Sequence, residues 1–394
     1  MLGVSVYPDL SPRAEIQEYL KLAASYGCTR VFSSMFSVEG SAEEVLALFE
    51  ELICTAHEVG MEVSLDVNGQ CLKKLGASPE NLEVFYQLGC DILRMDVPMG
   101  TEEMLKLIDN PYGIRIEMNA SMGERGADYV RDLIRRGADP KRLLLCHNFY
   151  PQRYTGMKWE KFLQTNQTLK ETGVPICAFI ASHAENTYGV WDAKDGLCTV
   201  EKHRDLPIDL QLREMLATEC VDDVEIGNAY ASEEELKSLQ EVMTPFIDSE
   251  NNPMHAIMKS FGAAVSGETK AVLQKKVRIT LDEKISELEK EILFQFYPHR
   301  DMGDSSEWIW RSRMPRMMYA DRSIPARPFA KEWFQRGDVM IVNDNYKHYA
   351  GEVQIALRPV KNDGTRNLAG RLSLQEQEML ELIHDNDTVV FLKG

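Results

Sequence analysis

The first 250 residues alternate short apolar segments with amphipathic stretches eight times, and this alternation constrains the fold more than any other feature. A short apolar run bounded by turn residues is typical of a buried strand, and apolar residues at helical spacing indicate a helix packed against it. The predicted strands span 2–8, 29–35, 62–67, 92–97, 114–120, 142–149, 176–182 and 224–228. The predicted helices span 12–25, 42–59, 79–88, 101–108, 124–136, 159–171, 207–218 and 233–243. Eight such units favour a (β/α)₈ barrel, and the lack of a Gly-rich dinucleotide loop disfavours the alternative, a doubly wound open sheet.

The remaining residues change character and indicate a second domain. Predicted strands span 276–281, 291–297, 339–342, 352–357 and 388–392, with one helix near 374–383. The segment Asn362-Asp363-Gly364 is typical of a tight hairpin turn. We therefore expect a (β/α)₈ catalytic barrel over residues 1–250, followed by a β-rich domain, a small barrel, over residues 251–394.

Composition excludes several classes of protein. Hydrophobic residues make up 44% and charged residues 27% of the chain, which excludes a disordered chain or a collagen-like repeat. Residues 1–250 hold 42 acidic and 23 basic side chains, so binding to nucleic acid or an anionic membrane is not expected. The eight cysteines are scattered and none lies beyond Cys220, which predicts neither a zinc site nor a disulfide framework. With no signal-peptide pattern at the start, we expect a cytoplasmic protein.

Alternation along the predicted strands selects the side chains that face the barrel interior. With apolar neighbours such as Leu93 and Met95 facing the helices, Arg94 and Asp96 face inward. The same reasoning on the other strands gives a polar interior set: Ser5, Tyr7, Ser64, Asp66, Asn68, Arg115, Glu117, Asn119, Glu225 and Gly227. Loops at the strand ends add His147, Asn148, Tyr150 and Arg153.

Carboxylates gathered in this way suit general acid, base or nucleophile chemistry, because their mutual repulsion raises the pKa of one of them. Asp66, Asp96 and Glu117 are the candidate catalytic residues. Arg115 lies early in its strand, where buried ion pairs often serve structure alone. Two other uses stay open: a metal-dependent phosphosugar isomerase or epimerase, and a non-catalytic protein that binds a sugar phosphate.

A basic cluster stands out in the second domain. Five arginines lie between Arg311 and Arg327, against the single acid Asp321. Guanidinium groups bind phosphate and carboxylate bidentately, so Arg311 and Arg316 are candidates for an anionic substrate group. A salt-bridge seam without a ligand is the structural alternative.

Motifs along the whole chain resemble the 6-phospho-N-acetylmuramidase (MupG-type) family. They are Gly3-Val4-Ser5-Val6-Tyr7-Pro8, Asp66-Val67-Asn68, Arg94-Met95-Asp96, Ile116-Glu117-Met118-Asn119-Ala120-Ser121, His147-Asn148-Phe149-Tyr150-Pro151, Tyr154-Thr155-Gly156, Arg311-Ser312, Pro315-Arg316, Arg336-Gly337-Asp338-Val339 and Tyr349-Ala350-Gly351-Glu352.

The resemblance implies a TIM barrel followed by a cyclophilin-like domain. It also implies a cytoplasmic glycosidase that splits 6-phospho-N-acetylmuramic acid from N-acetylglucosamine during peptidoglycan recycling. No cofactor and no metal are expected for this reaction, and the partner is a phosphorylated amino-sugar disaccharide. We expect it to be bound by Tyr7, Asn68, Arg94, Asn119, His147, Asn148, Tyr150, Arg153, Glu225, Arg311 and Arg316. The sequence does not assign acid, nucleophile or base, retention or inversion, or the oligomeric state, and attack by the substrate's own N-acetyl group stays open.

Overall fold

The computed structural model describes residues 1–35, 38–97, 99–191, 193–245, 274–296 and 298–394. The chain divides into two compact units, Met1–Glu241 and Val242–Gly394. The boundary predicted at 250/251 falls within residues 246–273, outside the described residues. Among the described residues, no helix is long and apolar enough to cross a membrane.

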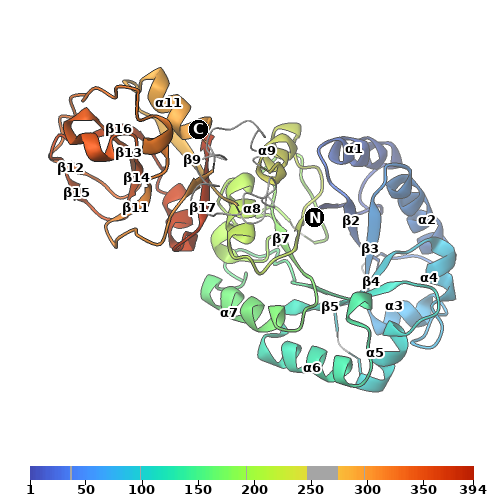
Figure 1. The fold of residues 1–394 in the computed structure, drawn as a ribbon. Helices are drawn as coiled ribbons and strands as arrows, with labels where there is room; N and C mark the ends of the chain where they lie inside the picture. Colours follow the sequence, from blue (N-terminus) through green and yellow to red (C-terminus); the bar gives the residue numbers. More distant parts are fainter. Residues whose placement is uncertain (36–37, 98, 192, 246–273, 297) are drawn as a thin grey trace. The chain divides into compact units, whose positions relative to one another are not determined.

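The first unit is a closed barrel of eight parallel strands in sequence order, which confirms the predicted fold (Figure 1). The strands are β1 (Leu2–Ser5), β2 (Arg30–Ser34), β3 (Glu62–Val67), β4 (Ile92–Met95), β5 (Arg115–Asn119), β6 (Leu143–Cys146), β7 (Ile176–Ile180) and β8 (Asp223–Ile226). Almost all of their residues are buried, as expected for strands covered by helices outside and by packed side chains inside.

Helices cover the outside of the barrel. They are α1 (Arg13–Ser25), α2 (Ala42–Glu58), α3 (Gly69–Lys74), α4 (Glu83–Leu88), α5 (Thr101–Ile108), α6 (Glu124–Arg135), α7 (Trp159–Lys170), α8 (Ile208–Ala217) and α9 (Glu233–Met243). Gly89 ends α4 with a positive φ of 86°, a conformation that glycine adopts without steric cost. The helix predicted from Pro79 begins instead at Glu83, because Ser78 and Asn81 pair in a short bridge before it.

The strand register confirms the predicted interior face. Asp66 on β3 is the Cα partner of Arg94 on β4, and Arg94 is the partner of Glu117 on β5. Partners on adjacent strands point to the same side of the sheet, so these three side chains share one interior row. Arg115 lies two residues before Glu117 and pairs with Glu62, at the start of the strands.

The second unit is β-rich, as predicted. Its strands are β9 (Gln274–Leu281), β10 (His299–Arg300), β11 (Ile309–Ser312), β12 (Trp333–Phe334), β13 (Asp338–Val342), β14 (Val353–Ala356), β15 (Val360–Lys361), β16 (Arg366–Arg371) and β17 (Thr388–Lys393). Seven of them form one sheet in the order β10-β17-β9-β16-β13-β14-β11. The two edge strands approach each other through a hydrogen bond of 3.1 Å between His299 Nδ1 and Ser312 Oγ, so the sheet curls toward a barrel.

The structure of this unit differs from the sequence prediction at three places. The strand predicted over 291–297 is wrong, because Glu287–Phe294 forms helix α11, which Ser286 and Glu289 start with a capping box. The helix expected near 374–383 is a 3₁₀ helix over Glu376–Leu382. Gly364 does make a turn, with a φ of 79°, but the turn joins β15 to β16, which pair with different strands, so it is not a hairpin.

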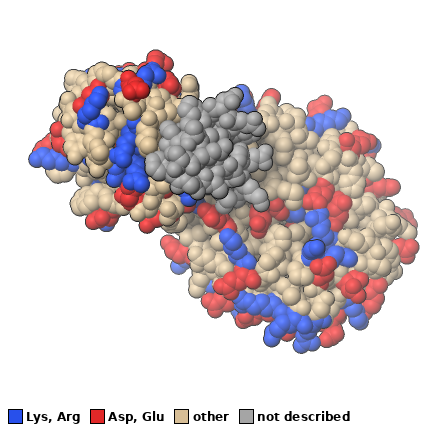
Figure 2. All heavy atoms as spheres, viewed as in Figure 1, with Lys and Arg blue, Asp and Glu red and all other residues tan. Residues whose placement is uncertain are grey.

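Charged side chains of both signs lie close together on the barrel face seen in Figure 2. Ion pairs between partly exposed side chains of the barrel include Arg131 with Glu171 and Arg136 with Asp132.

Candidate active site at the barrel mouth

Arg94 organises the polar end of the barrel. Its Nη1 donates to Asp66 Oδ1 at 2.6 Å and to Asp96 Oδ1 at 3.4 Å. Its Nη2 donates to Asn148 Oδ1 at 2.5 Å. These residues come from the C-terminal ends of β3, β4 and β6, the end of a (β/α)₈ barrel at which catalytic groups assemble.

The two aspartates on Arg94 lie in different environments. The side chain of Asp66 is 8% exposed and that of Asp96 is 35% exposed. Burial raises the pKa of Asp66 to about 6, although Arg94 opposes the shift, and the nearby Asp96 adds to it. The site thus pairs a carboxyl that holds its proton to higher pH with one that water and ligands reach.

Asn119 holds Asp96 from the neighbouring strand. Its Nδ2 lies 3.3 Å from the backbone oxygen of Asp96 and 3.4 Å from Asp96 Oδ1. Its Oδ1 accepts a hydrogen bond of 2.8 Å from the backbone N–H of Ser121. The amide therefore connects the strand end of β5 to the carboxylate that follows β4.

A buried histidine lies behind this cluster. His147 has no exposed surface, its Nε2 is 2.8 Å from Asn166 Oδ1, and its Nδ1 is 3.1 Å from Ser121 Oγ. Burial lowers the pKa of His147 to about 4, so the ring is neutral at neutral pH. Since Asn166 Oδ1 accepts, Nε2 carries the proton and Nδ1 accepts from the Ser121 hydroxyl. Ser121 Oγ in turn accepts from the backbone N–H of Asn148 at 3.0 Å.

Glu117 lies deeper than the two aspartates and is fully buried. It accepts hydrogen bonds from Ser64 Oγ at 3.2 Å and from Arg30 Nη1 at 3.3 Å. Arg30 Nη1 also lies 3.5 Å from Glu225 Oε1. Burial raises the pKa of Glu225 to about 8, with Arg30 lowering it and Glu117 raising it. Glu117, Arg30 and Glu225 are each at most 1% exposed, so this second cluster is closed from solvent.

Among the described residues, one group has the side chains and spacing for a metal ion. The ligand atoms of Cys146, Cys177 and Glu225 all lie within 4.8 Å of one another. Burial raises the pKa of both thiols, so the sulfurs keep their protons, and the Arg30 guanidinium already lies beside Glu225. A cation there would have to displace two protons and compete with an arginine, which makes the group a poor metal site.

The other residues predicted to bind substrate divide by accessibility. Tyr7 is fully buried and donates to the backbone oxygen of Gly227 at 2.6 Å. The side chain of Asn68 caps α3 by accepting from Gln70 N and Cys71 N. Tyr150 is partly exposed, and Arg153 pairs with Asp195 at 3.1 Å and Asp205 at 2.7 Å. Tyr7, His147 and Glu225 are therefore buried, whereas Asn148, Tyr150 and Arg153 are partly exposed.

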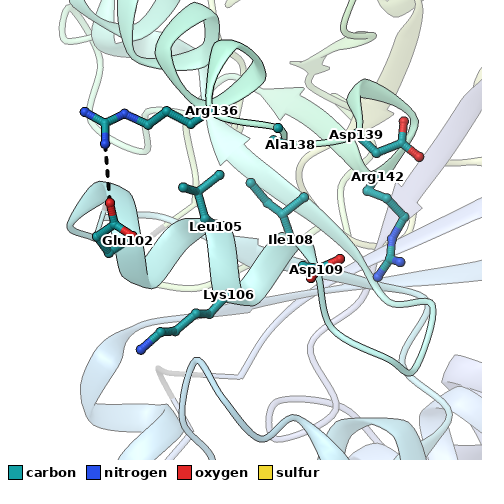
Figure 3. A pocket seen from close by; sticks show the side chains of 10 residues that line it. Glu102, Leu105, Lys106, Ile108, Asp109, Arg136, Ala138, Asp139 and Arg142 are labelled. Carbon is teal, nitrogen blue, oxygen red and sulfur yellow. Dashed lines mark hydrogen bonds and ion pairs between the residues drawn. The ribbon is translucent and has the colours of Figure 1, made fainter.

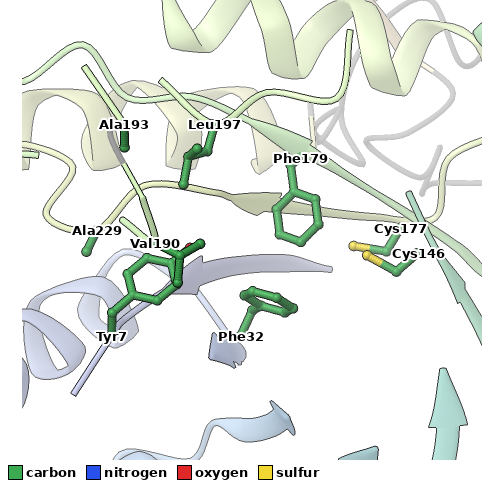
Figure 4. Packing of buried hydrophobic residues seen from close by; sticks show 9 residues of the cluster. All are labelled: Tyr7, Phe32, Cys146, Cys177, Phe179, Val190, Ala193, Leu197 and Ala229. Carbon is green, nitrogen blue, oxygen red and sulfur yellow. The ribbon is translucent and has the colours of Figure 1, made fainter. Parts of the chain in front are cut away.

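Aromatic side chains line the same end of the barrel. Phe179 packs edge-to-face against Phe32 and Phe149, with ring centroids 5.2 and 5.0 Å apart. Phe32, Phe179 and Tyr7 lie in one buried cluster with the two cysteines (Figure 4). Phe149 is only partly buried and contacts the exposed Trp191.

In the second unit, Arg311 and Arg316 converge on one buried acid. Arg311 Nη2 lies 2.6 Å from Glu352 Oε1, and Arg316 Nη1 lies 2.9 Å from the same oxygen. Both guanidinium carbons lie 5.2 Å from the ring centroid of Tyr349. Of the five arginines, only Arg311 and Arg316 meet on Glu352. The other three pair with separate acids: Arg313 with Asp304, Arg322 with Glu291 and Arg327 with Glu289.

Both units match one protein family. The N-terminal region of the 6-phospho-N-acetylmuramidase family matches residues 2–241, and its C-terminal region matches residues 276–392. The chain belongs to the 6-phospho-N-acetylmuramidase family, and is therefore a glycosidase. Among solved structures, an uncharacterized B. cereus protein is 32% identical, with a TM-score of 0.82 and 99% of each chain covered. A conserved Enterococcus faecalis protein of unknown function is 25% identical, with a TM-score of 0.67, covering 100% of this chain and 96% of its own. No curated protein matches the chain.

The structure shows two features that the sequence analysis missed: the Ser121 hydroxyl beside His147 and the exposed Trp191. Ser121 appeared only inside a motif, and Trp191 was not singled out. A signal for Trp191 was available: the connection between β7 and α8 is much longer than most strand–helix loops, and long loops at this end of a barrel often carry function.

A surface hollow between α5 and the end of α6 lies away from the candidate site (Figure 3). Its lining includes Asp109, Asp139 and Arg142, which precede β5 and β6. These residues lie at the N-terminal ends of the strands, opposite the catalytic end. Its one drawn ion pair joins Arg136 to Glu102 at 3.3 Å between exposed side chains.

Proposed function

We propose that this glycosidase hydrolyses the bond between 6-phospho-N-acetylmuramic acid and N-acetylglucosamine, in the cytoplasm, as a step of peptidoglycan recycling. Membership of the family supports the sugar class. The observation that carries the chemistry is that Asp66 and Asp96 share one nitrogen of Arg94 at the barrel mouth. Glycoside cleavage requires two carboxyl groups in different protonation states, and these two lie in different environments.

Asp66 is the general acid in this proposal and Asp96 the nucleophile. The raised pKa of Asp66 lets it carry a proton to the leaving oxygen, and the exposure of Asp96 lets it reach the anomeric carbon. Contacts of 2.6 and 3.4 Å to one nitrogen place the two Oδ1 atoms at most about 6 Å apart. Retaining glycosidases separate their carboxyl groups by about 5–5.5 Å and inverting enzymes by about 6.5–9.5 Å. The spacing therefore favours retention of configuration.

Glu117 has a supporting role in this proposal. It is enclosed by Ser64 and Arg30 and has no exposed surface, so it does not reach a substrate that occupies the mouth. Its negative charge instead helps to raise the pKa of Asp66, with which it shares an interior row through Arg94.

Polar groups around the aspartates would bind the muramic sugar. Asn119, Asn148 and Tyr150 present amide and phenol groups at or beside the mouth. Arg311 and Arg316 are the proposed ligands of the phosphate, because two guanidinium groups fixed side by side match a dianion.

Product analysis by mass spectrometry tests the proposal. The protein is incubated with the 6-phosphorylated disaccharide and its unphosphorylated counterpart, each with and without EDTA. We expect release of the two monosaccharides from the phosphorylated disaccharide but not from the unphosphorylated one, and we expect EDTA to have no effect. Asp66→Asn and Asp96→Asn should lower the rate of release by about 100-fold or more. Asp128→Asn, the same change on an exposed side chain of α6, should leave it unchanged. An intact disaccharide with the unmodified protein would overturn the proposal.

A further inference from the structure

Trp191 is held exposed in the long connection between β7 and α8. Its surface is 62% exposed, and its backbone has a φ of 61°. A positive φ is costly for a large side chain outside glycine, and such residues persist where the surrounding structure fixes them. Here Val190 and Ala193 are buried in the aromatic cluster on either side, as Figure 4 shows. Buried residues therefore flank Trp191 in the chain, while its own indole is exposed.

The Trp191 indole packs against Phe149. Its ring centroid lies 6.4 Å from that of Phe149, at an interplanar angle of 59°. Phe149 rests edge-to-face on Phe179, at 5.0 Å, and on Phe32, at 6.0 Å. Phe149 thus contacts the exposed indole and is itself packed on Phe32 and Phe179, so the platform is apolar.

This platform adjoins the carboxylate site directly. Phe149 follows Asn148 in the chain, and the Asn148 side chain accepts from Arg94. The mouth therefore has a charged half around Arg94 and an apolar half around Phe149 and Trp191. The two halves adjoin where Phe149 follows Asn148 in the chain.

From this arrangement, which rests on the proposed function, we propose that Trp191 and Phe149 form the subsite for the leaving sugar. The C–H face of a neutral N-acetylated pyranose packs on aromatic rings and gains from apolar burial there. The phosphorylated sugar carries negative charges and suits the charged half. One disaccharide then spans both halves, with its glycosidic oxygen above Asp66 and Asp96.

The test compares two leaving groups on the full-length protein. Cleavage of the phosphorylated disaccharide is measured beside that of the methyl glycoside of 6-phospho-N-acetylmuramic acid, which lacks the second sugar. Trp191→Ala should lower kcat/KM for the disaccharide on the order of tenfold and leave the methyl glycoside within about twofold. Trp191→Phe should recover most of the loss. Trp333→Ala, an equally drastic change at a 42% exposed tryptophan of the second unit, is the matched control.

Binding of free N-acetylglucosamine provides a readout independent of turnover. In saturation-transfer NMR, the unmodified protein and Trp333→Ala should enhance the ring protons of the sugar, and Trp191→Ala should not. Equal losses of kcat/KM for both substrates in Trp191→Ala would overturn the subsite. So would an unchanged enhancement of the N-acetylglucosamine ring protons in that variant. A protein that binds N-acetylglucosamine through Trp191 but cleaves neither substrate would keep the subsite and overturn the proposed function.

Discussion

Ser121 Oγ lies 3.1 Å from Nδ1 of His147, and through this hydroxyl a histidine without exposed surface is connected to the barrel mouth. The same oxygen accepts from the backbone N–H of Asn148, whose side chain accepts from Arg94. The neutral ring of His147, fixed by Asn166, therefore determines which way the Ser121 hydroxyl points. His147 acts on the aspartates through this series of contacts and not by touching the substrate.

Ser121→Ala should reveal this positioning role. Without the hydroxyl, Asn148 loses its backbone acceptor and constrains Arg94 less, so we expect kcat to fall on the order of tenfold with KM nearly unchanged. Because Arg94 lowers the pKa of Asp66, a looser Arg94 should move the basic limb of the pH–rate profile to higher pH. Ser121→Thr, which keeps the hydroxyl, should restore both quantities, and Ser25→Ala on exposed α1 is the control. A pH profile unmoved in Ser121→Ala would contradict the role.

The raised pKa of Asp66 gives the pH dependence of activity a sign. A general acid works only when protonated, so kcat/KM should decline as pH rises above about 6. Asp66→Asn should lose about 10²–10⁴-fold on the disaccharide, the usual contribution of a positioned acid. A 4-nitrophenolate leaving group needs no proton, so the loss should shrink greatly on the 4-nitrophenyl glycoside. An equally large loss on both substrates would exclude Asp66 as the acid.

Removal of the proposed nucleophile should be rescued by a small anion. Asp96→Gly opens space at a side chain that is 35% exposed, where azide can attack the anomeric carbon. We expect little hydrolysis without azide and formation of a glycosyl azide with it, of configuration opposite to that of the substrate. NMR of the product sugar from the unmodified enzyme should show retention. Inversion there, or no azide product from Asp96→Gly, would assign the nucleophile elsewhere.

Strand register was predictable from the sequence, but depth within the barrel was not. Alternation places Asp66, Arg94 and Glu117 on the interior face, and the structure confirms this because a slip of one residue would bury their apolar neighbours wrongly. The same rule treats Glu117 and Asp96 alike, although one is fully buried and the other a third exposed. The depth of a side chain in the barrel depends on how the eight strands are staggered relative to one another, and the sequence of a single strand does not determine this stagger.

The helix α11 and the loop residue Trp191 show two other limits. The apolar residues around Ile292 fit a strand as well as a helix, and the Ser286 capping box decides for the helix. Trp191 gains its place only when Phe149, from the segment after β6, packs against it. Contacts between distant segments of this kind leave no local pattern.

The paired arginines of the second unit should govern preference for the phosphate. Arg316→Ala removes one guanidinium from the pair on Glu352 and leaves Arg311 in place. We expect the ratio of kcat/KM for phosphorylated over unphosphorylated disaccharide to fall on the order of tenfold or more. Arg322→Ala, at an exposed arginine with a long contact of 3.8 Å to Glu291, is the control and should keep the ratio. A ratio unchanged in Arg316→Ala would remove these arginines from the phosphate site.

Glu225 should make the barrel less stable as pH rises. Its pKa in the folded protein is about 8 against an ordinary 4.5, so the folded state binds more protons than the unfolded state between these values. The free energy of unfolding therefore falls as pH rises from about 5 to 8, by about 1.4 kcal/mol for each pKa unit of difference. Glu225→Gln carries no charge to bury, and Arg30 keeps Glu117, Glu62 and Asp223 as partners.

Thermal unfolding midpoints of Glu225→Gln and the unmodified protein, measured by circular dichroism at pH 5 and pH 8, test this expectation. Glu225→Gln should gain stability relative to the unmodified protein as pH rises, by roughly 3–4 kcal/mol across the range. Glu58→Gln, at an exposed position of α2, should follow the unmodified protein at both pH values. A constant difference between Glu225→Gln and the unmodified protein would mean that Glu225 is already ionised in the fold, held so by Arg30.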